Sequence, residues 1–346
     1  MKKLIIFIAL ILLVSIVITG CGGSKEVDSG IAKKVAENTG TDIDMSGVVL
    51  TIGAAEGKNG QAMLVAAGLD KTPYKVDFHV MQGGNLVLEA MAANQLDLGT
   101  GSQIPPIFAS QATNNGNLKI IATKKSSTLD QELVVAANSS IKTIADLKGK
   151  KIAYVKNTTA HYFLAKMLEN GGLSWTDVDS IPMSTSDGLS ALLTGEVDAL
   201  ASYGNSIRSA HAKGATTLES ADHVLSGDFY WYATPAAIAD PAKHAAILDY
   251  LSRYHEANEW ARQHPKEWAA AYAAQINQKP EEYLETYNEE NQQTATRIVP
   301  VDNATIASEQ DIVNIFAKLG LLPEGIDISK IFDHSFDEAI SKFTKY

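Results

Sequence analysis

The chain has 346 residues, of which 45% are hydrophobic and 20% charged, a composition typical of an ordinary globular protein. This length exceeds one typical domain and allows a sizeable buried core, which excludes a small disulfide-stapled fold. The net charge of −11 disfavours nucleic acid as a partner, because the sequence shows no basic patch that would offset it.

The N-terminus has the pattern of a secretory signal. Lys2 and Lys3 precede an unbroken apolar run over residues 4–13, which predicts a cleaved signal peptide at residues 1–20. A retained membrane-spanning helix is the alternative. It would need about 20 apolar residues and a stop-transfer flank, whereas this run gives way to Gly-Cys-Gly-Gly-Ser-Lys-Glu.

Cys21 is the only cysteine of the chain and stands where the apolar run ends. This arrangement resembles a bacterial lipobox, in which the thiol is diacylated and the new amine is commonly acylated as well. A chance cysteine beside an ordinary export cleavage site is the alternative. Residues 21–46 are polar and lack strong periodicity, so we expect a lipidated tether. The predicted location is the extracytoplasmic face of the cell membrane.

Strand-like and helix-like segments alternate from residue 48 onward. Short β-branched runs at residues 48–53, 76–80 and 96–99 are separated by apolar helical patterns. Strands that alternate with helices predict a doubly wound α/β fold with a parallel sheet.

The same plan recurs later in the chain. A strand at residues 152–155 leads into helices at 162–168 and 188–193. The segment around Asp198 resembles the one around Asp97, and capping or surface roles are expected for both carboxylates. These similarities predict two lobes of similar topology, with chance likeness between two strand-helix-strand units as the alternative.

Two apolar extended segments, residues 133–137 and 229–233, flank the second unit. If both cross between the lobes, they form a two-strand hinge. Four helical patterns follow and should cover the first sheet, because a sheet face needs covering. The expected division is lobe I at 47–135 plus 232–346 and lobe II at 136–231, with late helices at 242–263, 266–275, 281–292 and 304–319.

We find no specific catalytic or metal-binding motif in the sequence. There is no His-Glu-x-x-His pair, no Cys/His cluster, no nucleophile elbow and no glycine-rich phosphate loop. Small polar residues instead recur where strands end and helices begin. Unpaired N–H groups and the positive end of the helix dipole make such positions attractive to an anion, although they can also serve as simple caps and turns.

Several segments resemble one family in their order and spacing, namely residues 83–85, 95–101, 144–153, 159–162 and 193–199. They look like the nitrate/sulfonate/taurine class of periplasmic-type solute-binding proteins. Residues 299–304 are similar to the C-terminal part of its alkanesulfonate-binding members.

The resemblance implies a type II periplasmic-binding-protein fold, in which two doubly wound α/β lobes clamp a ligand. It also implies a non-enzymatic, monomeric protein without metal or cofactor, which delivers a small anionic solute to the transmembrane subunits of an ABC permease. The ligand-binding positions carried over from the family are Gln61, Gly84, Asn85, Ser102, Gln103, Thr158, Thr159, Ala160 and His161.

Three further residues complete the predicted site. Tyr203 and Tyr230 supply aromatic surface beside the interlobe region, with core packing as their alternative role. Arg297 is the candidate side-chain partner for the anion, whereas Arg208, Arg253 and Arg262 are interpreted as surface helix residues.

The favoured ligand is an aliphatic sulfonate or taurine, with nitrate or bicarbonate as alternatives. An enzyme on the same scaffold, with sulfinate or thiamine-pyrimidine chemistry, is a second hypothesis. Relatives with that chemistry use a nucleophilic cysteine or Cys/His-rich motifs, whereas Cys21 lies in the tether. A sensory or adhesive lipoprotein is a third possibility.

Overall fold

The computed structural model describes residues 43–54, 59–276 and 278–344. The predicted signal peptide, Cys21 and nearly all of the predicted tether lie outside the described residues. Within the described part of the chain, no helix combines the length and apolarity needed to cross a membrane.

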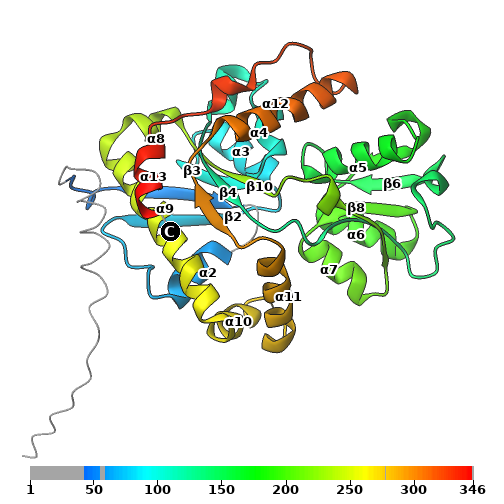
Figure 1. Ribbon diagram of the computed structural model, residues 1–346, viewed down its shortest axis with the longest axis horizontal. Coiled ribbons are helices and arrows are strands. Elements are labelled where there is room, and N and C mark those ends of the chain that lie inside the picture. Colours follow the sequence, from blue (N-terminus) through cyan, green and yellow to red (C-terminus); the bar gives the residue numbers. More distant parts are fainter. Residues whose placement is uncertain (1–42, 55–58, 277, 345–346) are drawn as a thin grey trace, which may run out of the picture.

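The first sheet has six strands and forms the centre of the first lobe (Figure 1). β2, β1 and β3 run parallel, while β10 runs antiparallel between β3 and β4. The order is β11-β4-β10-β3-β1-β2. The strands are β1 (Val49–Ala54), β2 (Lys75–Val80), β3 (Leu98–Ser102), β4 (Lys119–Lys125), β10 (Asp228–Ala233) and β11 (Arg297–Val299).

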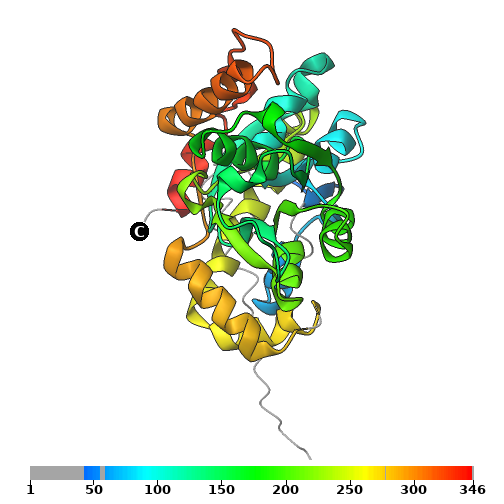
Figure 2. The ribbon, with the colours of Figure 1, turned by 90° about the vertical axis from the view of Figure 1, so that its right-hand side faces the viewer.

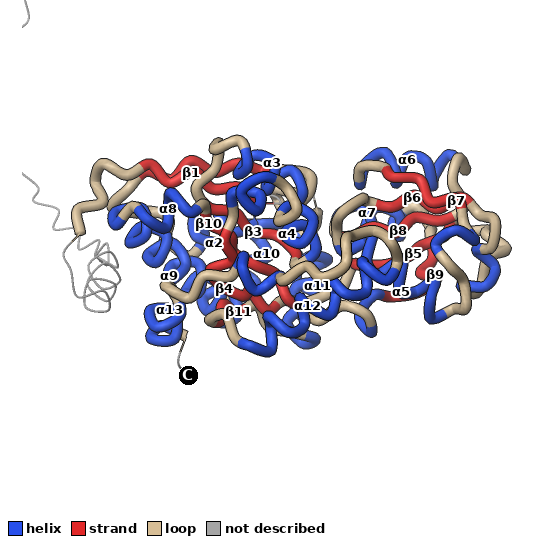
Figure 3. Tube along the Cα trace, turned by 90° about the horizontal axis from the view of Figure 1, so that it is seen from above, coloured by secondary structure: helices blue, strands red, loops and turns tan. Residues whose placement is uncertain are grey.

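The second sheet has five strands and repeats the plan of the first, without an equivalent of β11. Its order is β7-β6-β8-β5-β9, with β7, β6 and β8 parallel and β5 antiparallel to both of its neighbours. Figure 3 shows the two groups of strands, each surrounded by helices. The strands are β5 (Gln131–Val135), β6 (Lys151–Tyr154), β7 (Asp179–Pro182), β8 (Ala199–Tyr203) and β9 (Thr216–Ser220).

Asp97 and Asp198 occupy equivalent places in these two sheets, as the sequence similarity predicts. The Asp97 carboxylate accepts hydrogen bonds from the backbone N–H and the hydroxyl of Thr51, and Asp198 accepts from the backbone N–H of Lys151. Each aspartate therefore fastens the start of its own strand segment to the neighbouring strand, which is a structural role.

Helices cover both sheets. Proline opens α9, α10 and α11, where its fixed φ suits the first helical turn and its missing N–H costs no hydrogen bond. The predicted late helices are present at nearly the expected positions. The helices of the first lobe are α2 (Asn59–Ala66), α3 (Gly84–Ala92), α4 (Ile104–Ala109), α8 (Pro235–Ala239), α9 (Pro241–Gln263), α10 (Pro265–Ala273), α11 (Pro280–Gln293), α12 (Asn303–Lys318) and α13 (Asp337–Phe343), and those of the second are α5 (Thr159–Asn170), α6 (Thr185–Thr194) and α7 (Asn205–Ala212).

Both crossings between the sheets lie earlier along the sequence than predicted. Residues 133–135 belong to β5 inside the second sheet, and residues 229–233 belong to β10 inside the first. Both segments are apolar because they are interior strands with a neighbour on each side, so their composition does not mark a crossing. The connecting segments are residues 126–130 and 221–227.

These two connecting segments are joined to each other. The backbone N–H of Ser126 donates to the carbonyl of Gly227 over 3.0 Å. Gly227 has φ +75°, and a Cβ there would lie 2.8 Å from the Ser126 carbonyl oxygen, so this close approach requires glycine.

The lobes also touch through aromatic side chains beside the connections. Phe108 and Phe316 of the first lobe pack on His161 of the second, with ring centroids 6.0 and 5.6 Å apart. Figure 2, which looks onto the second lobe, shows α12 above it and α11 below it.

Candidate functional site

A cavity of about 540 Å³ lies between the lobes. Both lobes and the first connecting segment contribute to its wall. Five of the predicted site residues line it: Gly84, Ser102, Thr158, Thr159 and Tyr203. They come from strand ends and helix starts of both sheets, where ligands bind in open α/β folds.

Two helices begin at this cavity without a side-chain cap. Gly84 is the first residue of α3, and Thr159 is the first residue of α5. Gly83 and Thr158 precede them in extended conformation, and neither helix start receives a capping hydrogen bond from a side chain. The first N–H groups of each helix, together with its dipole, therefore favour negative charge at the cavity.

Lys124 places a buried cation in the cavity wall. Strand register sets Lys124 opposite Phe229, and Phe229 opposite Ser102, so the three side chains form a row on one face of the sheet. The Lys124 ammonium lies 5.0 Å from the centroid of the Phe229 ring, and the residue is 1% exposed. This row supplies a positive charge, an aromatic face and a hydroxyl to one cavity.

Tyr203 connects the two lobes at the cavity wall. It ends β8 in the second lobe, and its hydroxyl lies 3.6 Å from the point where a side chain on Gly83 of the first lobe would begin. Burial raises the pKa of the Tyr203 hydroxyl to about 12, against the opposing effect of a hydrogen bond with Thr158. Tyr203 therefore stays neutral at physiological pH and can offer its hydroxyl as a hydrogen-bond donor.

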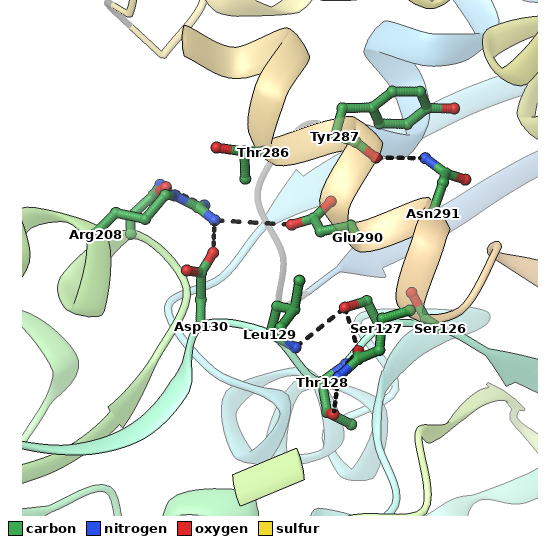
Figure 4. Close-up of polar contacts among 12 residues, drawn as sticks. Ser126, Ser127, Thr128, Leu129, Asp130, Arg208, Thr286, Tyr287, Glu290 and Asn291 are labelled. Atoms are coloured by element: carbon green, nitrogen blue, oxygen red, sulfur yellow. Dashed lines mark hydrogen bonds and ion pairs between the residues drawn. The ribbon is translucent and has the colours of Figure 1, made fainter. Parts of the chain in front are cut away.

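A charged cluster closes another part of the cavity wall (Figure 4). Arg208 of α7 reaches across to Glu290 of α11, with 3.9 Å between nitrogen and oxygen, and forms an ion pair with Asp130 of the connecting segment. Burial raises the pKa of Asp130 despite the nearby guanidinium. The expectation that Arg208 is a surface helix residue is wrong, because its half-buried side chain contacts two other chain segments, the connecting segment and α11.

Seven predicted site residues do not line the cavity. Gln61 is half-buried on α2, Asn85 is half-buried in the first turn of α3, and Ala160 is buried in the core beneath α5. Gln103 is also buried, and its side-chain oxygen accepts a hydrogen bond from Ser226 of the second connecting segment.

His161, Tyr230 and Arg297 likewise lie elsewhere. His161 is packed among Phe108, Tyr154, Trp175 and Phe316, because it sits on the core face of α5. Tyr230 is fully buried and donates to Glu309, since it points to the opposite face of β10 from Phe229. Arg297 is exposed on the edge strand β11.

The interpretation of Arg253 as a surface residue is also wrong. Arg253 is 2% exposed and pairs with the fully buried Asp249 over 2.7 Å. Arg262 is half-buried and donates to the carbonyl of Thr296.

The sequence interpretation missed a group of tyrosines that lines the cavity from the helices of the first lobe. Their spacing in α11, four residues apart, is the only sequence signal, and it is the ordinary pattern of a core-facing helix stripe. The residues are Tyr254, Tyr272, Tyr283 and Tyr287.

The described residues contain no group of three or more His, Cys, Asp or Glu side chains placed to hold a metal ion. The described cavity wall presents amides, hydroxyls, aromatic rings, aliphatic side chains and a few charged side chains.

Residues 67–268 match the family model described as NMT1/THI5 like. Among curated proteins, the chain is 29% identical over 284 residues to a protein of Escherichia coli (strain K12) named as an aliphatic sulfonates-binding protein, covering 81% of this chain and 86% of the relative.

Two solved structures share the architecture. The periplasmic aliphatic sulphonate binding protein of Escherichia coli has a TM-score of 0.70 at 27% identity, covering 82% of this chain and 91% of that one. The alkanesulfonate-binding protein of Xanthomonas axonopodis pv. citri, bound to MOPS, has a TM-score of 0.75 at 21% identity, covering 82% and 98%, which shows the fold alone. All three relatives are named as binding proteins and none as an enzyme.

Proposed function

The chain belongs to the NMT1/THI5-like family, and from this premise we propose that it is the extracytoplasmic solute-binding protein of an ABC importer. The proposed ligand is a small organic anion, with an aliphatic sulfonate or taurine favoured, held in the interlobe cavity and delivered to the permease. The names of the relatives that match most of the chain support the sulfonate class.

The observation that carries this proposal is that several hydrogen-bond donors converge on one cavity. Two uncapped helix starts and the buried Lys124 ammonium lie in its wall, and they come from distant parts of the chain. A sulfonate has three oxygens that can accept hydrogen bonds from the N–H groups, hydroxyls and Lys124 ammonium in this wall. Nitrate and bicarbonate offer similar oxygens and remain alternatives for the same site.

Ligand capture is proposed to involve rotation of one lobe on the other. Two short connecting segments join the lobes, and they are hydrogen-bonded to each other between Ser126 and Gly227. Such a pair of adjacent connecting segments can absorb a domain closure while the lobes stay intact. Closure would bury the ligand and form the surface that the permease recognises.

Replacing Lys124 with methionine is expected to weaken sulfonate binding about 10- to 100-fold, because a hydrogen bond to a charged group contributes about 1.5–3 kcal/mol. Calorimetry against ethanesulfonate, taurine, nitrate and bicarbonate measures this change. Lys119→Met is the matched control, since Lys119 starts the same strand and its ammonium donates to the Lys330 carbonyl. Equal sulfonate affinity of the parent and Lys124→Met would contradict the proposed site. A binding heat with nitrate or bicarbonate but with no sulfonate would mean that the ligand is one of those two anions.

We also propose that Cys21 carries the lipid that holds the protein at the membrane. The lipobox-like sequence around Cys21 supports this, because two or more acyl chains anchor stably where a single chain binds only marginally. In a bacterial host grown with labelled fatty acid, the parent should incorporate the label and Cys21→Ser should not. Equal labelling of the parent and Cys21→Ser would rule out lipid anchoring at this residue.

A further inference from the structure

Four tyrosine rings form a part of the cavity wall that does not belong to the proposed anion site. Tyr254 comes from α9, Tyr272 from α10, and Tyr283 and Tyr287 from α11. Each of the four residues is at least nine-tenths buried. Only a small area of each ring therefore faces the cavity, and the rest packs in the core.

These rings hold one another in place. The centroids of Tyr272 and Tyr283 lie 4.9 Å apart, and those of Tyr283 and Tyr287 lie 6.3 Å apart. The buried Trp268 stacks on Tyr272 at 5.0 Å and supports the group from behind. The wall is therefore a rigid surface that exists before any ligand arrives, which lowers the entropy cost of binding.

The size of the cavity exceeds what a short alkanesulfonate needs. Its volume of about 540 Å³ falls in the range of pockets that enclose drug-sized molecules. The helices that carry the tyrosines add no aliphatic side chain of their own to the described wall. Its aliphatic members come from other segments and are Met63, Val80, Met81, Leu129 and Ile276. Aromatic rings gain extra stabilisation from offset or edge-to-face contact with another ring, which an alkyl chain does not provide.

We propose that this tyrosine wall is a subsite for the organic part of the ligand, and that the preferred ligand class is aryl sulfonates instead of short alkanesulfonates. This inference rests on the proposed function, because the sulfonate group would bind at Lys124 and the helix starts. The ring would then extend over the tyrosines of α10 and α11.

Calorimetry with ethanesulfonate and benzenesulfonate tests the subsite. We expect the parent protein to bind benzenesulfonate at least tenfold more tightly than ethanesulfonate. Tyr283→Leu and Tyr287→Leu should weaken benzenesulfonate binding at least fivefold and ethanesulfonate binding less than twofold. Tyr250→Leu is the matched control, because Tyr250 is a buried tyrosine of α9 that does not line the cavity.

The outcomes separate this inference from the proposed function. Equal affinity of the parent for both sulfonates, or equal weakening of both by the tyrosine variants, would overturn the aromatic subsite and leave the anion site standing. Failure of both sulfonates to bind the parent protein would overturn the sulfonate assignment itself. Thermal unfolding of each variant, compared with Tyr250→Leu, shows whether the fold has been kept.

Discussion

Replacing Arg253 with methionine is expected to lower the free energy of unfolding by about 3–5 kcal/mol, the usual cost of removing one partner from a buried ion pair. Arg253 of α9 donates to Asp249, which is 0% exposed and also accepts from the hydroxyl of Tyr74 over 2.9 Å. The guanidinium also donates to the carbonyl of Lys71. The substitution leaves the carboxylate buried with one hydrogen-bond donor and no countercharge.

Urea unfolding of the soluble protein measures this loss. The double variant Arg253→Met/Asp249→Leu should recover much of it, because no charge then stays buried. Arg262→Met serves as the matched control on the same helix, because its partly exposed pair with Glu259 is expected to contribute about 0–1 kcal/mol. A cost for Arg253→Met no larger than that of Arg262→Met would show that the buried pair does not hold α9 in place.

The stability of the protein is expected to fall on acidification because of His161. Burial among aromatic rings lowers the pKa of His161 to about 4, with Lys156 adding to the effect. Its Nδ1 accepts from the backbone N–H of Asn157 over 3.3 Å, and its Nε2 is buried without a partner. The imidazole therefore has no nearby group that would stabilise a second proton.

The unfolded chain binds a proton at His161 near pH 6.5, whereas the folded protein does so only near pH 4. The neutral ring therefore makes its full contribution to the free energy of unfolding above pH 6.5. This contribution, about 3 kcal/mol, is lost as the pH falls toward 4. We expect the difference in unfolding free energy between parent and His161→Phe to shift by this amount between pH 7 and pH 4. A difference that stays constant over this range would mean that His161 titrates alike in both states.

The repeated architecture was predictable because its signals are local. Each parallel unit is a short apolar strand followed by a helix, and the likeness between the segments around Asp97 and Asp198 reflects equivalent hydrogen bonds in the two sheets. The crossing points were not predictable in the same way. Interior strands such as β5 and β10 are apolar in either lobe, and only tertiary pairing decides which sheet takes them.

The sequence predicts those parts of the candidate site that backbone groups form. It does not predict the parts that depend on which way a side chain points. Gly84 and Thr159 open helices, and helix starts can be recognised from small polar residues. Phe229 and Tyr230 are adjacent, and no pattern in the sequence says which of the two faces the cavity. Lys124 and Lys125 present the same ambiguity, which the register of β4 and β10 resolves.

The insertion of β10 between β3 and β4 affects the order in which the two lobes of a nascent chain can fold. Residues 131–220 hold every strand of the second sheet, so that lobe can assemble as soon as this stretch is free. β3 and β4 have no central partner until residues 228–233 follow, and unpaired strand edges are prone to aggregation. The lobe that begins first along the chain is therefore the one that is completed last, after β10 and then β11 have been added to its sheet.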